Sequence, residues 1–208
     1  MTSAPFVELA EPGTRLMPLH VDQYHDMIAK GILPEGAPWE LIDGLIKAKN
    51  RGAVGESPMT VGLEHSWAVT NLEEFNRRLS RLGCHMRTQQ PVTLPPYNEP
   101  EPDGAIIIGP KSAYRKRRPG ARDVACVIEV ADSSLRDDRT SKQRVYANSG
   151  IPQYVIINLP DRVVEVYTQP LVGKDRYGQS VTLGPSQTVA LRAARGRELK
   201  VAVRRLLP

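Results

Sequence analysis

The feature that most constrains this chain is a single carboxylate inside an otherwise apolar strand. Residues 124–131 read VACVIEVA, and every side chain in this run except Glu129 is apolar. The composition predicts a strand over residues 123–131. Residues two apart share one face of a strand, so Val127, Glu129 and Ala131 point the same way. A carboxylate there is costly to bury unless it is paired or holds a metal.

A second acid and a helical face supply the groups that Glu129 needs. Asp103 follows Pro102 at the start of another predicted strand, and two hard oxygen ligands from adjacent strands suit Mg²⁺ or Mn²⁺. Asp138, Lys142 and Tyr146 recur every four residues, which places them on one helix face. We expect Tyr146 to pack inward and to fix Lys142 beside the acids. These groups are the ones needed for metal-assisted phosphodiester hydrolysis.

The remaining pattern predicts a mixed fold of the α/β or α+β class. An Asp43-Gly44 pair indicates a hairpin, and Gly83 and Gly150 are suited to end helices. Residues 1–18 are Pro-rich and predict a loosely held arm, followed by one domain over residues 19–208. The expected elements are a helix over 21–32, the hairpin over 39–48, a long helix over 63–82, strands over 85–94, 103–108 and 123–131, a helix from 137 or 138 to 148, strands over 153–159 and 162–168, and one or two further short strands before an Arg-rich tail.

Composition excludes several classes of protein. With 208 residues, 40% hydrophobic and 25% charged, the chain can bury a core and is not of the disordered class. Its apolar runs fall far short of the roughly 20 residues that a bilayer requires, and the first residues lack a secretory pattern. Two cysteines are too few for a disulfide framework. We therefore expect a cytoplasmic protein without a membrane segment.

The net charge of +5 permits a polyanionic partner without requiring one. Basic residues cluster in residues 114–120. Such a run is commonly a solvated loop; the functional alternative is a surface that follows a phosphate backbone. The candidate nucleic-acid contacts are Arg115, Lys116, Arg117 and Arg118.

Several motifs resemble a known family. These are EPD at residues 101–103, VIEVADSS at 127–134, GIPQYVIIN at 150–158 and the segment at 21–46 that ends in ELIDGLI. In this order they are similar to the Uma-two (Uma2) family of restriction-type endonucleases, within the PD-(D/E)xK nuclease superfamily. The resemblance implies a restriction-endonuclease-like αβββαβ core with a mixed sheet flanked by helices. It also implies Mg²⁺ or Mn²⁺ as cofactor, DNA as partner, and Asp103 and Glu129 as metal ligands.

Two positions depart from the family pattern. The superfamily has Lys two residues after the Glu, where this chain has Ala131. The resemblance implies that Lys142 on the following helix supplies the charge instead. Relatives commonly carry Glu after the Asp-Gly pair, where this chain has Leu45. Glu40 remains, and it matches an acid of the family.

Other candidates keep two interpretations. Glu40 is either a site acid or a surface strand residue, and His65 either serves the site or packs the long helix. Gln89 either lines the site or lies on a solvated face. Tyr146 fits packing with a hydrogen bond better than catalysis.

The functional prediction is a divalent-metal-dependent endonuclease that hydrolyses phosphodiester bonds in DNA, with Asp103, Glu129, Lys142 and Glu40 as catalytic residues. The alternative is a catalytically inactive binding or regulatory module with the nuclease fold, which Ala131 motivates. A third class is a self-associating protein that pairs sheet edges. Since nucleases of this superfamily often dimerise, a homodimer is expected under the first interpretation as well.

Overall fold

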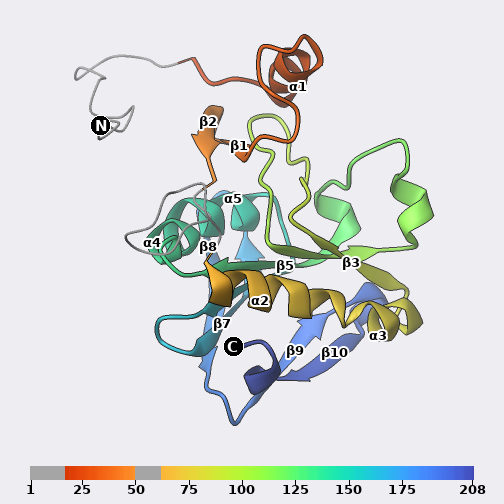
Figure 1. Ribbon diagram of the computed structural model, residues 1–208, viewed down its shortest axis with the longest axis vertical. Coiled ribbons are helices and arrows are strands. Elements are labelled where there is room, and N and C mark those ends of the chain that lie inside the picture. The colour runs from red at the N-terminus through yellow and green to blue at the C-terminus, as the bar shows by residue number, and fades with distance from the viewer. Residues whose placement is uncertain (1–16, 50–61) are drawn as a thin grey trace.

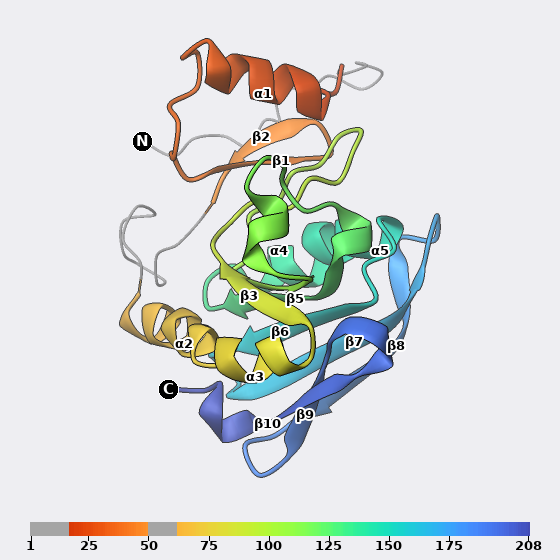
Figure 2. The same ribbon diagram turned by 90° about the vertical axis from the view of Figure 1, so that its right-hand side faces the viewer.

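The computed structural model describes residues 17–49 and 62–208, so the predicted N-terminal arm lies almost wholly outside the described residues. Three tiers follow one another in both views (Figures 1 and 2). Helix α1 (Val21–Ala29) and the hairpin of β1 (Trp39–Ile42) and β2 (Leu45–Ala48) form one end. A large sheet fills the middle. Strands β9 (Thr188–Arg192) and β10 (Glu198–Ala202) form the other end.

The middle sheet has six strands in the order β3-β4-β5-β6-β7-β8. Neighbours are antiparallel except β5 and β6, which are parallel and are joined by a helical crossover. The predicted mixed α+β fold with an αβββαβ core is thereby confirmed. The strands are β3 (Cys84–Thr88), β4 (Gly104–Ile108), β5 (Val124–Ala131), β6 (Gln153–Asn158), β7 (Val163–Leu171) and β8 (Arg176–Leu183).

Strand β5 lies at the centre of this arrangement, and all eight of its residues are buried. A strand covered on both faces reads as a continuous apolar run, which explains the sequence around Glu129. Helices α2 (Leu63–Glu73) and α3 (Asn76–Arg81) pack with β9 and β10 against one face. Helix α5 (Gln143–Asn148) packs against the other face through Val145, Tyr146 and Ala147.

The predicted long helix over residues 63–82 is in fact two helices. The N–H of Phe75 bonds to the carbonyl of Leu72 at 3.2 Å, three residues back, which tightens the turn between α2 and α3. The buried residues Ala68, Leu72, Phe75 and Leu79 still form one stripe across the break, whereas Trp67 is 44% exposed.

The predicted helix ending at residue 148 begins earlier, at Leu135, and is not uniform. A short α4 (Leu135–Asp137) leads into a π-helical turn at Asp138–Lys142 and then into α5. Wider turns of this kind occur often at functional sites. Here the turn holds Asp138 and Lys142, both buried. The crossover ends as predicted at Gly150, which has a φ of 71°.

Two strand predictions need correction. The strand expected over 85–94 ends at Thr88, because Gln89 has a φ of 48° and leaves the extended conformation. The chain beyond residue 168, expected to hold one or two further short strands, holds three: β8, β9 and β10. In β10, exposed Glu198 and Lys200 flank buried Leu199, an alternation typical of a strand that the expectation of an Arg-rich tail overlooked. Within residues 17–49 and 62–208, no helix has the length and apolar character needed to cross a bilayer.

Candidate active site

Asp103 and Glu129 lie side by side where β4 begins and β5 ends. These strands are antiparallel, with Gly104 opposite Ile128, so the residue before β4 meets Glu129. The backbone N–H of Asp103 donates to Glu129 Oε2 at 3.3 Å. Both side chains are buried, with 3% and 1% of their residues' surface exposed. The two acids, 26 positions apart in the chain, therefore meet in the interior on one side of the sheet.

Each oxygen of Asp103 has a partner. Lys49 Nζ donates to Oδ1 at 2.9 Å. The N–H of Val130 donates to Oδ2 at 2.9 Å, and His65 Nε2 lies 3.1 Å from the same oxygen. The other ring nitrogen of His65, Nδ1, is buried and has no hydrogen-bond partner among the described residues. A buried, unpaired ring nitrogen is costly unless a ligand or water completes it.

Glu129 is held from the crossover helix. Lys142 Nζ donates to Glu129 Oε1 at 3.0 Å, and the Tyr146 hydroxyl donates to the same oxygen at 2.8 Å. Lys142 Nζ also lies 3.5 Å from Glu40 and 3.9 Å from Asp138. One buried ammonium is therefore surrounded by three carboxylates.

The electrostatics differ between the two acids. Burial disfavours the charged form of Asp103, but Lys49 and the His65 contact outweigh burial and hold its pKa well below the usual range. Burial raises the pKa of Glu129, Lys142 offsets only part of that, and the neighbouring Asp103 raises it further. Burial likewise lowers the pKa of Lys142, but the surrounding carboxylates more than reverse this and hold it well above its usual range. Lys142 is therefore charged at neutral pH.

The hairpin of β1 and β2 brings Glu40 to the site. Its turn residues Asp43 and Gly44 have φ values of 54° and 74°, as the sequence predicted for a tight two-residue hairpin. Backbone hydrogen bonds between Leu41 and Glu99, at 3.3 and 2.8 Å, attach it to the segment before Asp103. Glu40 Oε2 then accepts the N–H of Glu101 at 3.2 Å.

These residues open into a cavity of about 360 Å³. Its wall includes Glu40, His65, Asp103, Glu129 and Lys142, so the structure gathers these five sequence-predicted residues at one cavity. Tyr146 touches the cavity acid Glu129 from behind. Gln89 contributes differently: its backbone N–H bonds to the Asp103 carbonyl at 3.3 Å.

The donor chemistry fits a divalent cation, because carboxylate oxygens from two strands are the ligands that Mg²⁺ and Mn²⁺ favour. The unpaired His65 Nδ1 also marks a place that a ligand or its water can complete. In this structure Lys49 pairs with Asp103, and Lys142 pairs with Glu129, so each acid has a lysine as its counter-ion. In the described part of the chain, no group of three or more His, Cys, Asp or Glu side chains is arranged to hold a metal ion.

Lys49 is the site residue that the sequence did not reveal. It is buried, lines the cavity and contacts Asp103 directly. The only local signal is the Lys47-Ala48-Lys49 alternation, which puts two lysines on one face of a strand whose partner carries Glu40 opposite Lys47.

The basic loop lies at the opposite end of the strands. It joins the end of β4 to the start of β5, whereas Asp103 precedes β4 and Glu129 lies near the end of β5. Arg117 pairs with Asp123 at 2.6 Å, and Arg118 pairs with Glu99 at 2.5 Å.

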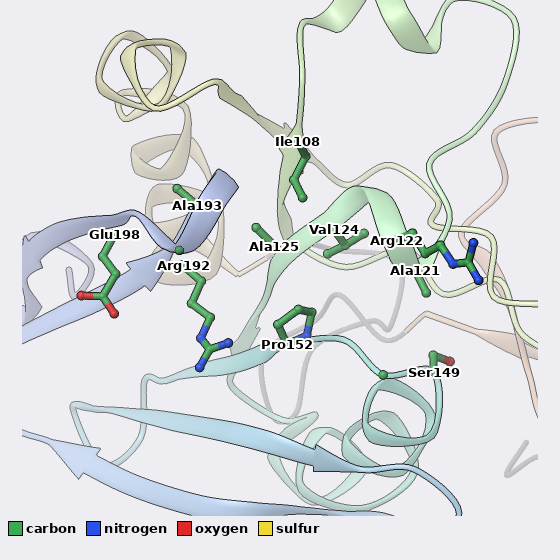
Figure 3. Close-up of a pocket in the computed structure, with 12 residues that line it drawn as sticks. Ile108, Ala121, Arg122, Val124, Ala125, Ser149, Pro152, Arg192, Ala193 and Glu198 are labelled. Carbon is green, nitrogen blue, oxygen red and sulfur yellow. The ribbon is translucent and has the colours of Figure 1, made fainter.

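A second cavity, of about 450 Å³, lies at that same far end of β5 (Figure 3). Its floor is formed by small and apolar side chains such as Val124, Ala125 and Pro152, with Arg122 and Arg192 at its sides. Its lining residues include no buried carboxylate pair of the kind found in the first cavity.

The order of helix, three strands, helix and strand places the chain in the restriction-endonuclease-like fold class. A solved structure described as "a putative nuclease belonging to DUF820 from Anabaena variabilis ATCC 29413" is similar to it, with a TM-score of 0.64. The two are 18% identical, and the match covers 91% of this chain and 97% of that chain. At this identity the likeness shows the fold. The model of the Uma2 family, described as "Putative restriction endonuclease", matches residues 21–202, and the chain belongs to this family. No curated protein matches it.

Proposed function

We propose that this protein is a divalent-metal-dependent endonuclease that hydrolyses phosphodiester bonds in DNA. The observation that carries the proposal is the buried pair of Asp103 and Glu129, which line one cavity with a charged lysine. The Asp103 backbone N–H donates to the Glu129 carboxylate at 3.3 Å. Family membership supports the same reaction class.

Each residue has a separate task in this proposal. Asp103 and Glu129 would hold Mg²⁺ or Mn²⁺, with Glu40 assisting. Such an ion, when bound, polarises the phosphate and lowers the pKa of a coordinated water. Lys142 stabilises negative charge that develops on the phosphate oxygens. Tyr146 positions Glu129 through its 2.8 Å hydrogen bond and does not touch the substrate.

The candidate DNA contacts are basic side chains at the cavity and in the basic loop. Arg136 lines the cavity and is suited to a phosphate beside the cleaved bond. Arg115 and Lys116 of the basic loop are exposed, and no ion pair within residues 17–49 and 62–208 involves them. The loop joins the start of β5, at the end of that strand away from Glu129, so it would contact flanking phosphates. A homodimer would present two such sites to a duplex.

The test is nicking of supercoiled plasmid with Mg²⁺ or Mn²⁺, and with EDTA as the metal-free condition. Asp103→Asn and Glu129→Gln should abolish nicking while retaining the fold. The matched control Asp26→Asn changes an exposed acid of α1 whose ion pair among the described residues is with Lys30, and it should leave nicking unchanged. Nicking that persists in both site variants would refute the assignment.

One observation favours a second candidate, a binding module without catalysis. Ala131 occupies the place of the usual motif lysine, and both acids are already neutralised by lysines. Metal-independent DNA binding by the intact chain, without nicking under any divalent cation, would favour this candidate.

A further inference from the structure

Lys49 is an unusually enclosed cation for a residue just beyond a short hairpin strand. Only 5% of its side chain is exposed. Its ammonium donates to Asp103 Oδ1 at 2.9 Å and to the carbonyl of Glu101 at 2.5 Å. Lysines are almost never buried to this extent unless they are paired. Lys49 is therefore held in place by Asp103, the acid that the proposed function assigns to the metal.

The two oxygens of Asp103 are not equally accessible to a cation. Oδ2 already accepts the N–H of Val130 and is in contact with His65, both parts of the folded frame. Oδ1 is occupied by the Lys49 ammonium. A Mg²⁺ ion binds a carboxylate oxygen at about 2.0–2.1 Å, closer than the ammonium, and its two charges repel a neighbouring cation. The ion and Lys49 therefore compete for Oδ1.

We propose that Lys49 is a built-in counter-ion that a divalent cation must displace from Asp103, so that Lys49 sets the metal affinity of the site. This inference rests on the proposed function, since it concerns the same acids. It gives the site two arrangements, one closed by the ammonium and one in which the cation replaces it.

Lys49, rather than Lys142, is the lysine that is displaced. Lys142 lies among three carboxylates, Glu129, Glu40 and Asp138, within 3.9 Å. Lys49 forms an ion pair with one carboxylate within the described residues, and its second contact is a neutral carbonyl. Removing Lys49 from its partner therefore breaks fewer ion pairs.

The experiment measures Mn²⁺ binding by titration calorimetry to the full chain after treatment with EDTA. Lys49→Met keeps the length of the side chain and removes the charge, and it should raise Mn²⁺ affinity by about tenfold, the effect of losing an ion pair worth about 1.4 kcal/mol. Lys49→Arg keeps the charge and should bind no more tightly than the unmodified chain. The matched control is Lys47→Met, the same change two residues earlier on β2, where the lysine pairs with Asp137. It should stay within about twofold.

A second measurement guards against a folding defect. The increase in Tm on adding Mn²⁺ should be larger for Lys49→Met than for the unmodified chain. Equal Mn²⁺ affinity in the two, or no binding by either, would overturn the inference. So would an equal gain in Lys47→Met, because it would mean that only the general charge of the cavity matters.

Failure of the inference and failure of the proposed function are separable. If plasmid is nicked with metal but Lys49→Met binds Mn²⁺ no more tightly, the function stands and the inference fails. If Lys49→Met gains affinity but neither protein nicks DNA, the inference stands and the function fails.

Discussion

Loss of the Lys142 ammonium should be the most destabilising change of charge in the site. Lys142 lies 3.0, 3.5 and 3.9 Å from Glu129, Glu40 and Asp138. At an effective dielectric constant of about 20, each such pair is worth about 4–6 kcal/mol before the cost of dehydrating the charges. Removing one partner of a buried ion pair costs about 3–5 kcal/mol in practice. We expect Lys142→Met to lower the free energy of unfolding by that amount.

The loss of stability caused by Lys142→Met should also depend on pH. Burial raises the pKa of Asp138 to about 6 and that of Glu129 to about 8, while Lys142 opposes both shifts. Groups with a raised pKa bind more protons in the folded than in the unfolded chain, so the stability they contribute is present at low pH and lost as pH rises. Without Lys142 these pKa values rise further. The loss of stability should therefore be larger at pH 8 than at pH 5.

Urea unfolding followed by circular dichroism at both pH values measures this effect. The matched control Lys47→Met removes a lysine whose pair with Asp137 is more than one third exposed, and it should cost less than about 1 kcal/mol at either pH. A cost below about 1 kcal/mol for Lys142→Met at pH 8, or an equal cost at both pH values, would refute the reasoning.

Two further predictions concern other parts of the fold. The hydrogen bond from Arg117 holds the pKa of Asp123 at about 2, so its contribution to stability is present above about pH 4 and is lost as pH falls through 2. Asp123→Asn should make urea stability fall less steeply between pH 4 and pH 2; an unchanged slope would contradict this. Burial raises the pKa of the Cys84 and Cys126 thiols, so a thiol reagent should react with both only after unfolding. Rapid labelling of the native chain would show that this burial is wrong.

The sequence predicted those features whose signal is local. Glu129 stood out because it is the lone acid of a buried strand, and the spacing of Lys142 and Tyr146 placed both on one side of a helix. Both do contact Glu129, although the intervening turn is π-helical and not the regular α-helix on which the spacing argument relied. Their catalytic and positioning roles stay predictions.

Features that depend on distant contacts were missed. Whether Lys49 faces Asp103 is decided by where the hairpin docks, which Leu41 and Glu99 determine, and nothing near Lys49 in the sequence reports that docking. The break between α2 and α3 depends on Phe75 entering a core shared with the sheet. Strands β9 and β10 span only five residues each, so their alternation gives a weak signal beside the many arginines of this segment.

The hairpin that carries Glu40 has a consequence for biosynthesis. Glu40 and Lys49 are translated early, whereas Glu129 and Lys142 emerge about 80 to 100 residues later. The carboxylates therefore come together only after the central strands have paired and the hairpin has docked on the segment around Glu99. A nascent chain that has not yet reached Lys142 lacks this constellation, so the cavity and its buried charges can form only late in synthesis.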